Sequence, residues 1–318
     1  MNAAHIVRSK ELLAPPVKLD QAFDDGQAVL DLIDKGSPYK TEACVHHRPG
    51  EAMTGGWFRN FWALGGKVVF DGAEPLFHNA RFIEAAQQSF EAEIIRPVAM
   101  MTNLNLPAAG LPSHLDLPFF RGAANREVPS WMLAPMGYSG LFHDWAIPVA
   151  SAITWFYDGE GGAFEYWPQG LDAPSKSVRP PYSNMCVIAD NEYMHHRVGA
   201  TGAPAAHWAD DSIPYDATLE LTDGHDWRLS HGNAVLADFA YDKIRLSVLW
   251  KAFCFKDAAT AAAFDDHSND LTPDLVREIF CTDLGSRNIA FAEPGDPTAD
   301  LVWKDTLMTA YAAPQASM

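Results

Sequence analysis

The chain has 318 residues, of which 48% are hydrophobic, and it carries a formal net charge of −18. Nucleic-acid surfaces need clustered Lys and Arg to contact phosphates, so this acidic balance predicts a chain that does not bind nucleic acid. It has no uncharged apolar run long enough to cross a membrane and no basic-then-apolar leader. These features favour a soluble, cytoplasmic protein without a membrane partner.

The four cysteines are scattered without Cys-x-x-Cys spacing, which predicts neither a zinc ribbon nor a disulfide framework. No Ser/Gly/Pro-rich linker divides the chain, so we expect a single domain over residues 1–318. Nothing in the sequence indicates the oligomeric state.

Residues 1–95 are expected to be partly helical. Apolar residues recur at roughly helical spacing in "VKLDQAFDDGQAVLDLID" (17–34), and the spacing is clearer in "ARFIEAAQQSFEAEI" (80–94). Both segments therefore predict helices.

Residues 96–256 have a different sequence pattern, in which Gly, Pro and Asn separate short runs of β-branched and aromatic residues. This predicts an all-β core. Helical patterns return over 257–318, where Thr272 is suited to cap a helix that starts with Pro273. The order helix, strands, helix indicates a sandwich or barrel supported by terminal helices.

The first chemical motif lies in "LPSHLDLPFF", where His114 and Asp116 stand two residues apart. On a strand such residues face the same side, so both would point into the barrel. An isolated His-x-Asp is more often a structural ion pair than a metal site. Its meaning therefore depends on partners elsewhere in the chain.

Two further segments offer such partners. His195 and His196 end an apolar run in "VIADNEYMHHRV", and Arg245 and Ser247 share one face of the strand "KIRLSVLW". Two imidazoles and one carboxylate form a facial triad suited to Fe(II), with positions open for other ligands. An inward Arg offers a fork for a carboxylate, and Ser offers a hydroxyl donor.

Together these motifs resemble the Fe(II)/2-oxoglutarate-dependent dioxygenases, whose members carry His-x-Asp, a distant His and Arg-x-Ser in this order. The segment "GGAFEYWPQG" (161–170) is similar to a Gly-Gly turn, strand and Pro-Gly turn of the prolyl-hydroxylase-like members. The resemblance covers residues 98–255. It implies a double-stranded β-helix, a jelly-roll core like that of the cupins, over 96–256 with an inserted hairpin near 200–240.

The resemblance also implies a set of site residues. His114, Asp116 and His196 would bind Fe(II), while Arg245 and Ser247 would bind the far carboxylate of 2-oxoglutarate. The remaining candidates are Asn103 for the cosubstrate and Trp155, Tyr157 and Arg121 for the substrate.

The third metal ligand stays open at this point. His195 and His196 are adjacent, so only one of them can face inward on a strand. Arg245 follows His196 at a greater distance than is usual in the family, and His231 has the more usual spacing. We favour His196 and interpret the intervening segment as the inserted hairpin, with His231 as the alternative.

The implied activity is oxidation of a C–H bond of a small molecule by O2, with release of succinate and CO2. Halogenating members replace the carboxylate at the position of Asp116 with a small residue, so Asp116 favours a hydroxylase, or an enzyme of desaturation or ring formation, in biosynthesis or tailoring. Two alternatives remain. One is a cupin-like metal oxygenase that uses no keto acid, and the other is a catalytically silent barrel that binds a ligand.

Overall fold

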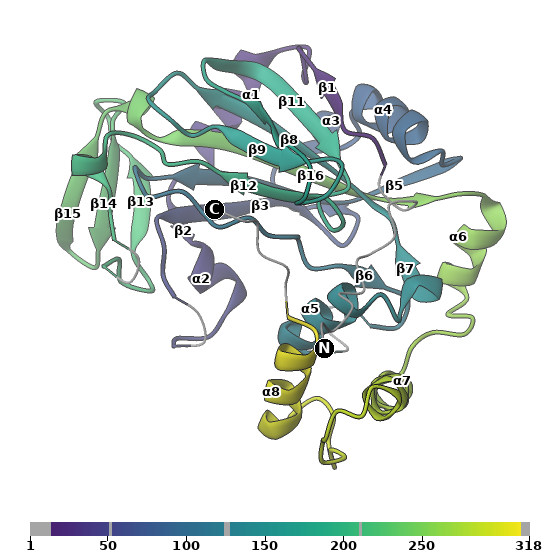
Figure 1. Cartoon of the computed structure of the whole chain (residues 1–318). Coiled ribbons are helices and arrows are strands. Elements are labelled where there is room, and N and C mark those ends of the chain that lie inside the picture. Colours follow the sequence, from purple (N-terminus) through teal and green to yellow (C-terminus); the bar gives the residue numbers. More distant parts are fainter. Residues whose placement is uncertain (1–13, 51–52, 124–127, 210–211, 313–318) are drawn as a thin grey trace.

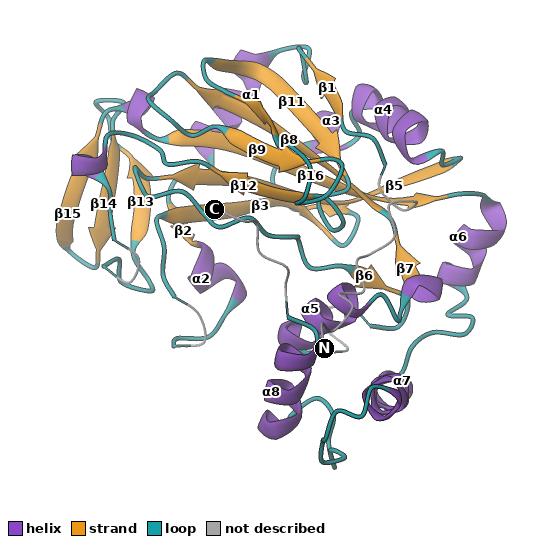
Figure 2. Cartoon of the chain, in the orientation of Figure 1, coloured by secondary structure: helices purple, strands orange, loops and turns teal. Residues whose placement is uncertain are grey.

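Two antiparallel β-sheets, one large and one small, form the centre of the protein in a computed structural model (Figures 1 and 2). The structure describes residues 14–50, 53–123, 128–209 and 212–312. The strands are β1 (Val17–Leu19), β2 (Tyr39–Thr41), β3 (Trp57–Leu64), β4 (Lys67–Val68), β5 (Ile94–Asn105), β6 (Phe119–Phe120), β7 (Ala146–Ile147), β8 (Val149–Tyr157), β9 (Phe164–Trp167), β10 (Lys176–Val178), β11 (Tyr182–Ala189), β12 (His195–Val198), β13 (Thr218–Leu221), β14 (Trp227–His231), β15 (Ala234–Phe239) and β16 (Arg245–Phe255). The helices are α1 (Gly26–Lys35), α2 (Glu42–His46), α3 (Glu74–Phe77), α4 (Ala80–Phe90), α5 (Ser130–Ser139), α6 (Ala258–Asp265), α7 (Pro273–Ser286) and α8 (Leu301–Ala310).

The large sheet has the strand order β1-β11-β8-β16-β5-β3-β2-β13-β14-β15, with β4 paired to β3. The last strand of the core, β16, lies between β8 and β5 and pairs with both over most of its length. A strand from the end of the core thus sits at the middle of the sheet. Side chains on its inner face are therefore enclosed on both sides.

The small sheet has the order β10-β9-β12 and packs against the inner face of the large one. Phe164 of β9 and Trp155 of β8 lie with their ring centroids 5.2 Å apart. The chain that follows β5 pairs with β12 through a bridge between His114 and His196, and with the segment after β12 through a bridge between Ala108 and Thr201. Two facing sheets with the chain crossing between them form a jelly roll. The mainly β fold with a double-stranded β-helix core and flanking helices is therefore confirmed.

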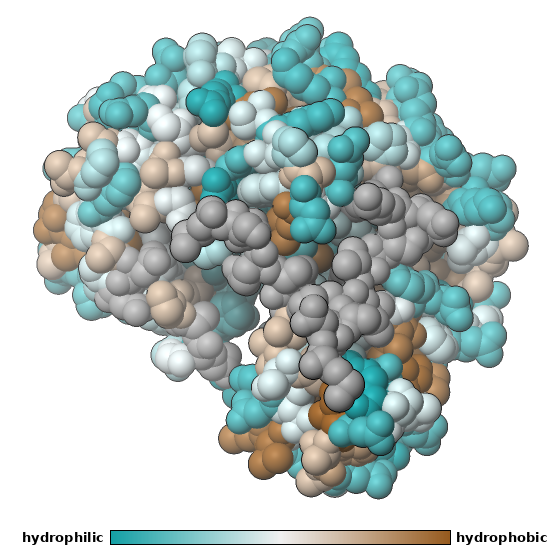
Figure 3. All heavy atoms as spheres, in the orientation of Figure 1, coloured by the Kyte–Doolittle hydropathy of each residue, from teal (hydrophilic) through white to brown (hydrophobic). Residues whose placement is uncertain are grey.

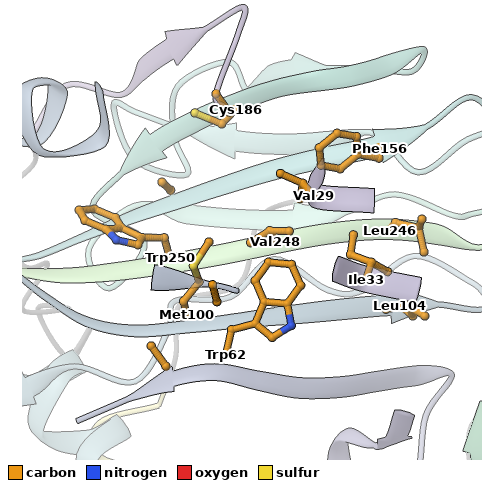
Figure 4. Packing of buried hydrophobic residues seen from close by; sticks show 14 of the residues in the cluster. Val29, Ile33, Trp62, Met100, Leu104, Phe156, Cys186, Leu246, Val248 and Trp250 are labelled. Atoms are coloured by element: carbon orange, nitrogen blue, oxygen red, sulfur yellow. The ribbon is translucent and has the colours of Figure 1, made fainter. Parts of the chain in front are cut away.

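The outer face of the large sheet carries the main hydrophobic core. Along β16 the residues Leu246, Val248 and Trp250 alternate with inward residues, and all three are almost completely buried. Figure 4 shows Leu246 and Val248 near Val29 and Ile33 of α1, with Trp250 further along the same strand. Helices α1 and α4 cover this face, so the sheet is buried on both sides (Figure 1).

A second core lies in a lobe below the barrel in Figure 1, formed by α5, α7 and α8. Phe280 of α7 is fully buried there, against Phe142 and Tyr311 at centroid distances of 5.0 Å. The outer side of α8 exposes Leu301 and Val302, and brown apolar patches mark the lobe in Figure 3. The lobe is therefore a separate hydrophobic unit rather than an extension of the barrel core.

The helix expected over 17–34 begins later in the structure. Val17–Leu19 forms β1 and pairs with β11, and helix α1 starts at Gly26. Asp25 caps the helix, because its side chain accepts hydrogen bonds from the backbone of Gln27 and Ala28. The prediction was thus wrong for the first part of this segment, where an apolar pattern that fits a helix serves an edge strand.

The other helical predictions agree more closely with the structure. Helix α4 begins at Ala80 but ends at Phe90, since Glu91 adopts a left-handed conformation (φ 49°) that stops it. Thr272 caps α7 as expected, accepting a hydrogen bond from the backbone of Leu275 at 3.2 Å. Residues 1–13 and 313–318 of the predicted end regions lie outside the described residues.

The strands β13, β14 and β15 fall within the range expected for an inserted hairpin and extend the large sheet through β2. The predicted single-domain organisation and its boundaries stay a prediction. Among the described residues, no helix is long and apolar enough to span a bilayer.

Candidate metal centre and cosubstrate pocket

The three predicted metal ligands lie close together in the structure. One donor atom each from His114, Asp116 and His196 lies within 4.8 Å of the others. The two histidines face each other across a short antiparallel pair, in which each backbone N–H donates to the other residue's carbonyl at 3.0 Å. The Asp116 N–H donates to the Asn191 carbonyl at 2.9 Å. Backbone pairing between distant segments thus sets the spacing of the three side chains.

Both imidazoles are oriented by the backbone just before them. His114 Nδ1 lies 3.0 Å from the Pro112 carbonyl, and His196 Nδ1 lies 3.0 Å from the Met194 carbonyl. A carbonyl only accepts hydrogen bonds, so in the neutral form of each ring Nδ1 carries the proton and Nε2 has the lone pair. Burial, followed by the nearby His196, lowers the pKa of His114, which favours its neutral form. Both rings therefore present the atom that a metal ion binds.

Asp116 uses its two oxygens differently. Oδ1 lies 3.5 Å from His196 Nε2, on the side of the histidines. Oδ2 accepts a hydrogen bond from Lys251 Nζ at 2.8 Å. Burial alone would raise the pKa of Asp116, but the charge of Lys251 and the contact with His196 hold it well below its ordinary value. The carboxylate is therefore ionised and points one oxygen toward the histidines.

A second acid, Glu192, also lies close to Lys251. Its Oε1 is 4.0 Å from Lys251 Nζ, and its Oε2 accepts a hydrogen bond from the Phe119 backbone at 3.2 Å. The side chain is completely buried, and burial raises its pKa well above the ordinary value. Lys251 thus bridges an ionised carboxylate and one that burial tends to protonate.

Arg245, the predicted cosubstrate residue, is 1% exposed and points into the barrel. Its Nε donates to the Gly162 carbonyl at 3.1 Å and its Nη1 to Asn105 Oδ1 at 3.4 Å. Its guanidinium carbon lies 5.8 Å from the Trp155 ring centroid and 6.0 Å from that of Tyr182.

The positive charge of Arg245 has no carboxylate partner within salt-bridge distance among the described residues, and its Nη2 makes no hydrogen bond with them. Burial lowers the pKa of Arg245 to about 10, and the Tyr182 and Tyr157 hydroxyls offset only part of that effect. A buried cation of this kind is costly without an anion. The site is thus electrostatically suited to an incoming carboxylate.

The Gly-Gly turn lies directly against this arginine. Gly161 and Gly162 both have positive φ, at 73° and 70°, which glycine adopts without strain. A Cβ on Gly162 would lie 3.0 Å from Arg245 Cδ, and one on Gly161 would collide with the Ala200 carbonyl. The two glycines therefore let the turn approach β16 closely enough for Gly162 to accept the Arg245 hydrogen bond.

The register places Asn103, Ser247 and Trp155 in one row across three neighbouring strands. Ser247 Oγ lies 3.4 Å from the Asn103 carbonyl, and Asn103 Oδ1 accepts a hydrogen bond from Arg59 Nε at 2.7 Å. Arg59 also contacts His46 Nε2 at 2.6 Å. This row lies next to Arg245 on the inner face of the large sheet.

The remaining candidates occupy other places. Tyr157 is buried beside Arg245, and its hydroxyl donates to the Glu160 carbonyl at 2.9 Å. The Arg121 guanidinium binds the Ser268 and Asp144 carbonyls, at 2.8 and 3.1 Å, and so joins the barrel to the segment that leads to α7. Arg121 thus belongs to a connection between backbone segments.

The two alternative histidines are not part of the metal cluster. His231 ends β14 and pairs with Asp216 at 3.0 Å, with nearly half of its side chain exposed. His195 pairs across the sheet with Trp167 and is buried, and as the neighbour of His196 on a strand it faces the opposite side.

Three residues around the site were not expected from the sequence, namely Lys251, Glu192 and Arg59. A signal existed for Lys251, because it continues the alternation of Arg245, Ser247 and Leu249 along β16. No sequence pattern indicated that Glu192 would be buried beside it.

No protein-family model matches the chain, and no curated protein sequence matches it either. The structure is similar to a solved oxidoreductase of the 2OG-Fe(II) oxygenase family from Burkholderia pseudomallei, with 14% identity and a TM-score of 0.42 over 77% of this chain and 89% of that one. It is similar to a Pseudomonas putida prolyl-4-hydroxylase, with 12% identity and a TM-score of 0.40 over 76% and 93% of the two chains. It is also similar to HygX from Streptomyces hygroscopicus, solved with nickel and 2-oxoglutarate, with 10% identity and a TM-score of 0.41 over 77% and 84%. These likenesses are too distant to bear on activity, so the residues of this chain carry the functional proposal.

Proposed function

We propose that the protein is an Fe(II)- and 2-oxoglutarate-dependent oxygenase that oxidises a C–H bond of a small molecule. The observation that carries this proposal is the buried guanidinium of Arg245, which has no anionic partner among the described residues and lies in the same barrel as the His114–Asp116–His196 cluster. A metal site alone is compatible with many activities. A metal site in the same barrel as a buried arginine without an anionic partner favours a metal ligand that carries a negative charge.

The donor set suits ferrous iron. Two imidazole Nε2 atoms and one carboxylate oxygen, with other positions open, form the facial triad of non-haem Fe(II) oxygenases. His114, Asp116 and His196 would hold the ion, and with 2-oxoglutarate and O2 the bound iron supplies C–H oxidation, releasing succinate and CO2. The two imidazoles, oriented by backbone carbonyls, and the ionised Asp116 are suited to bind it.

The chain's own part is to bind and shield the cosubstrate. The Arg245 fork would take the far carboxylate of the keto acid, with the Ser247 hydroxyl on the same strand face as a further donor. The aromatic rings of Trp155 and Tyr182 enclose the guanidinium and exclude water, which strengthens its attraction for an anion.

The substrate class is proposed on two grounds. The net charge of −18 disfavours a nucleic-acid substrate, which leaves small molecules as the favoured class. Asp116 fills the position that a halogenating enzyme needs for chloride, which supports hydroxylation, desaturation or ring formation. Analysis of the product would distinguish these three outcomes.

The test is an anaerobic titration of the metal-free protein with Fe(II) and 2-oxoglutarate, following the visible charge-transfer band of the chelated keto acid. We expect a band in the wild type that vanishes in His196→Ala and needs much more keto acid in Arg245→Met. Succinate release would then serve to screen candidate substrates.

The competing interpretations predict different results. A cupin-like oxygenase without a keto acid would bind iron but give no band, and its turnover would be indifferent to 2-oxoglutarate. A silent barrel would bind no iron. Either result would overturn the proposal.

A further inference from the structure

The inner face of β16 carries a second buried cation, Lys251, six residues beyond Arg245. The two have opposite surroundings. Arg245 has no carboxylate within salt-bridge distance among the described residues, whereas Lys251 has Asp116 at 2.8 Å and Glu192 at 4.0 Å. Both side chains come from the strand at the centre of the sheet, where the backbone pairs on both sides. The Lys251 backbone is therefore held by neighbouring strands on both sides.

Resting on the function proposed above, we propose that Lys251 is a positioning residue for the metal. It holds Asp116 Oδ2 by a charged hydrogen bond, so that Oδ1 alone faces the metal position.

The geometry separates the two oxygens of Asp116. Oδ2 is within hydrogen-bond distance of Lys251 Nζ, and Oδ1 is on the side of His196 Nε2, at 3.5 Å. A carboxylate that is free to rotate can bind a metal ion through both oxygens and so use one more coordination position. With one oxygen held by Lys251, a position stays open for the cosubstrate or dioxygen.

Lys251 is itself restrained. Only 12% of its side chain is exposed, and its ammonium group lies 2.8 Å from Asp116 Oδ2 and 4.0 Å from Oε1 of the fully buried Glu192. The second oxygen of Glu192 is held by the Phe119 backbone, in the segment just after the Asp116 loop. The Asp116 backbone N–H in turn donates to the Asn191 carbonyl at 2.9 Å, next to Glu192 in the chain, so the two acids that face Lys251 come from segments that are hydrogen-bonded to each other.

The test measures metal affinity directly, without turnover. Lys251→Met keeps an unbranched side chain one atom shorter and removes the charge and the donors, and Lys251→Arg keeps the charge. Lys243→Met is the control, because it removes an exposed lysine that pairs with Asp242 just before the same strand. Co(II) binding is followed by its absorption spectrum in the absence of 2-oxoglutarate. Partners that orient metal ligands typically contribute about 10- to 100-fold to metal affinity.

We expect Lys251→Met to bind Co(II) about 10- to 100-fold more weakly, Lys251→Arg to recover most of the loss, and Lys243→Met to bind like the wild type. A purely structural role would instead lower the melting temperature of the metal-free protein and leave Co(II) affinity unchanged, and that result would overturn the proposal.

A second measurement needs no variant. In a crystal structure of the wild type loaded with Ni(II), we expect Asp116 to bind through one oxygen while the other stays on Lys251. Chelation by both oxygens, or a Lys251 turned away, would refute the inference even if Lys251→Met does not fold.

The two proposals can fail separately. If the wild type binds Co(II) but gives no charge-transfer band with Fe(II) and 2-oxoglutarate, the proposed activity is wrong while the role of Lys251 can still be measured. If the band forms and Lys251→Met keeps full metal affinity, the activity stands and the positioning role is wrong.

Discussion

Replacement of Arg245 by Met is predicted to weaken the binding of 2-oxoglutarate without lowering the stability of the protein. The guanidinium is 1% exposed, and burial lowers its pKa to about 10, which is well below the ordinary value for arginine. A shift of this size corresponds to about 3 kcal/mol of unfavourable free energy for the charged form. Removing the group relieves that cost but gives up two neutral-acceptor hydrogen bonds, worth about 1 kcal/mol each. Arg245→Met should therefore leave the free energy of unfolding unchanged or raise it by about 1 kcal/mol.

The effect on 2-oxoglutarate is expected to be large and unfavourable. Removing one partner of a buried, hydrogen-bonded charge pair costs about 2 to 5 kcal/mol, which is a loss of affinity of about 30-fold or more. Arg245→Lys is the matched control, because it keeps the charge but loses the planar fork. Its affinity for 2-oxoglutarate should lie between those of the wild type and Arg245→Met.

The assay combines urea unfolding of the metal-free variants with keto-acid titration of the Fe(II)-loaded ones. A structural arginine would give the reverse pattern, with Arg245→Met destabilised by several kcal/mol and unchanged in its affinity for 2-oxoglutarate. That result would refute the assignment of Arg245 to the cosubstrate.

Three further outcomes are expected. His196→Ala should abolish the charge-transfer band while His231→Ala leaves it intact, because His231 pairs with Asp216 outside the metal cluster; loss of the band in His231→Ala would move the third ligand. Burial raises the pKa of Glu192 well above its ordinary value of 4.5, so between the two pKa values the folded protein keeps a proton that the unfolded chain has released. The raised pKa therefore stabilises the folded protein fully below pH 4.5, and this stabilisation is lost as the pH rises through the pKa of the folded state. Glu192→Gln should therefore flatten the fall in stability of the metal-free protein toward neutral pH, as measured by urea unfolding between about pH 5 and 8; an unaltered slope would show that Glu192 does not titrate in this way. Phe280→Ala should lower the stability of the helical lobe by about 3 to 5 kcal/mol, seen as an earlier thermal transition, with Co(II) affinity of the folded protein unchanged.

The parts of the site that could be predicted are those whose chemistry is local in sequence. His114 and Asp116 lie two residues apart, so strand alternation alone indicates that they face the same way. The same alternation indicates that Arg245 and Ser247 share a face. The Gly161–Gly162 pair signals a turn, since consecutive glycines mark backbone conformations that other residues avoid.

The parts that could not be predicted depend on pairing between distant segments. The meeting of His114 with His196 follows from backbone hydrogen bonds between segments that have no common pattern. Glutamates are rarely buried, so the sequence predicts Glu192 on the surface, and only the packing around Lys251 explains why it is buried. The early part of the expected helix over 17–34 failed for a similar reason, because its pairing with β11 outweighs a weak local preference.

The helical lobe has a consequence for how the chain can be shortened and how it folds. Its core joins α5, which follows the Asp116 segment, to α7 and α8 at the far end of the chain, and the whole second half of the barrel lies between them in sequence. The contacts of this lobe are thus among the most distant in the chain, and closing such a loop has a high entropic cost before its contacts form. The lobe should assemble after the barrel has brought its two halves together. A truncation before α7 would leave the apolar face of α5 exposed directly beyond the metal-binding segment, so such a fragment should aggregate rather than persist as a smaller enzyme.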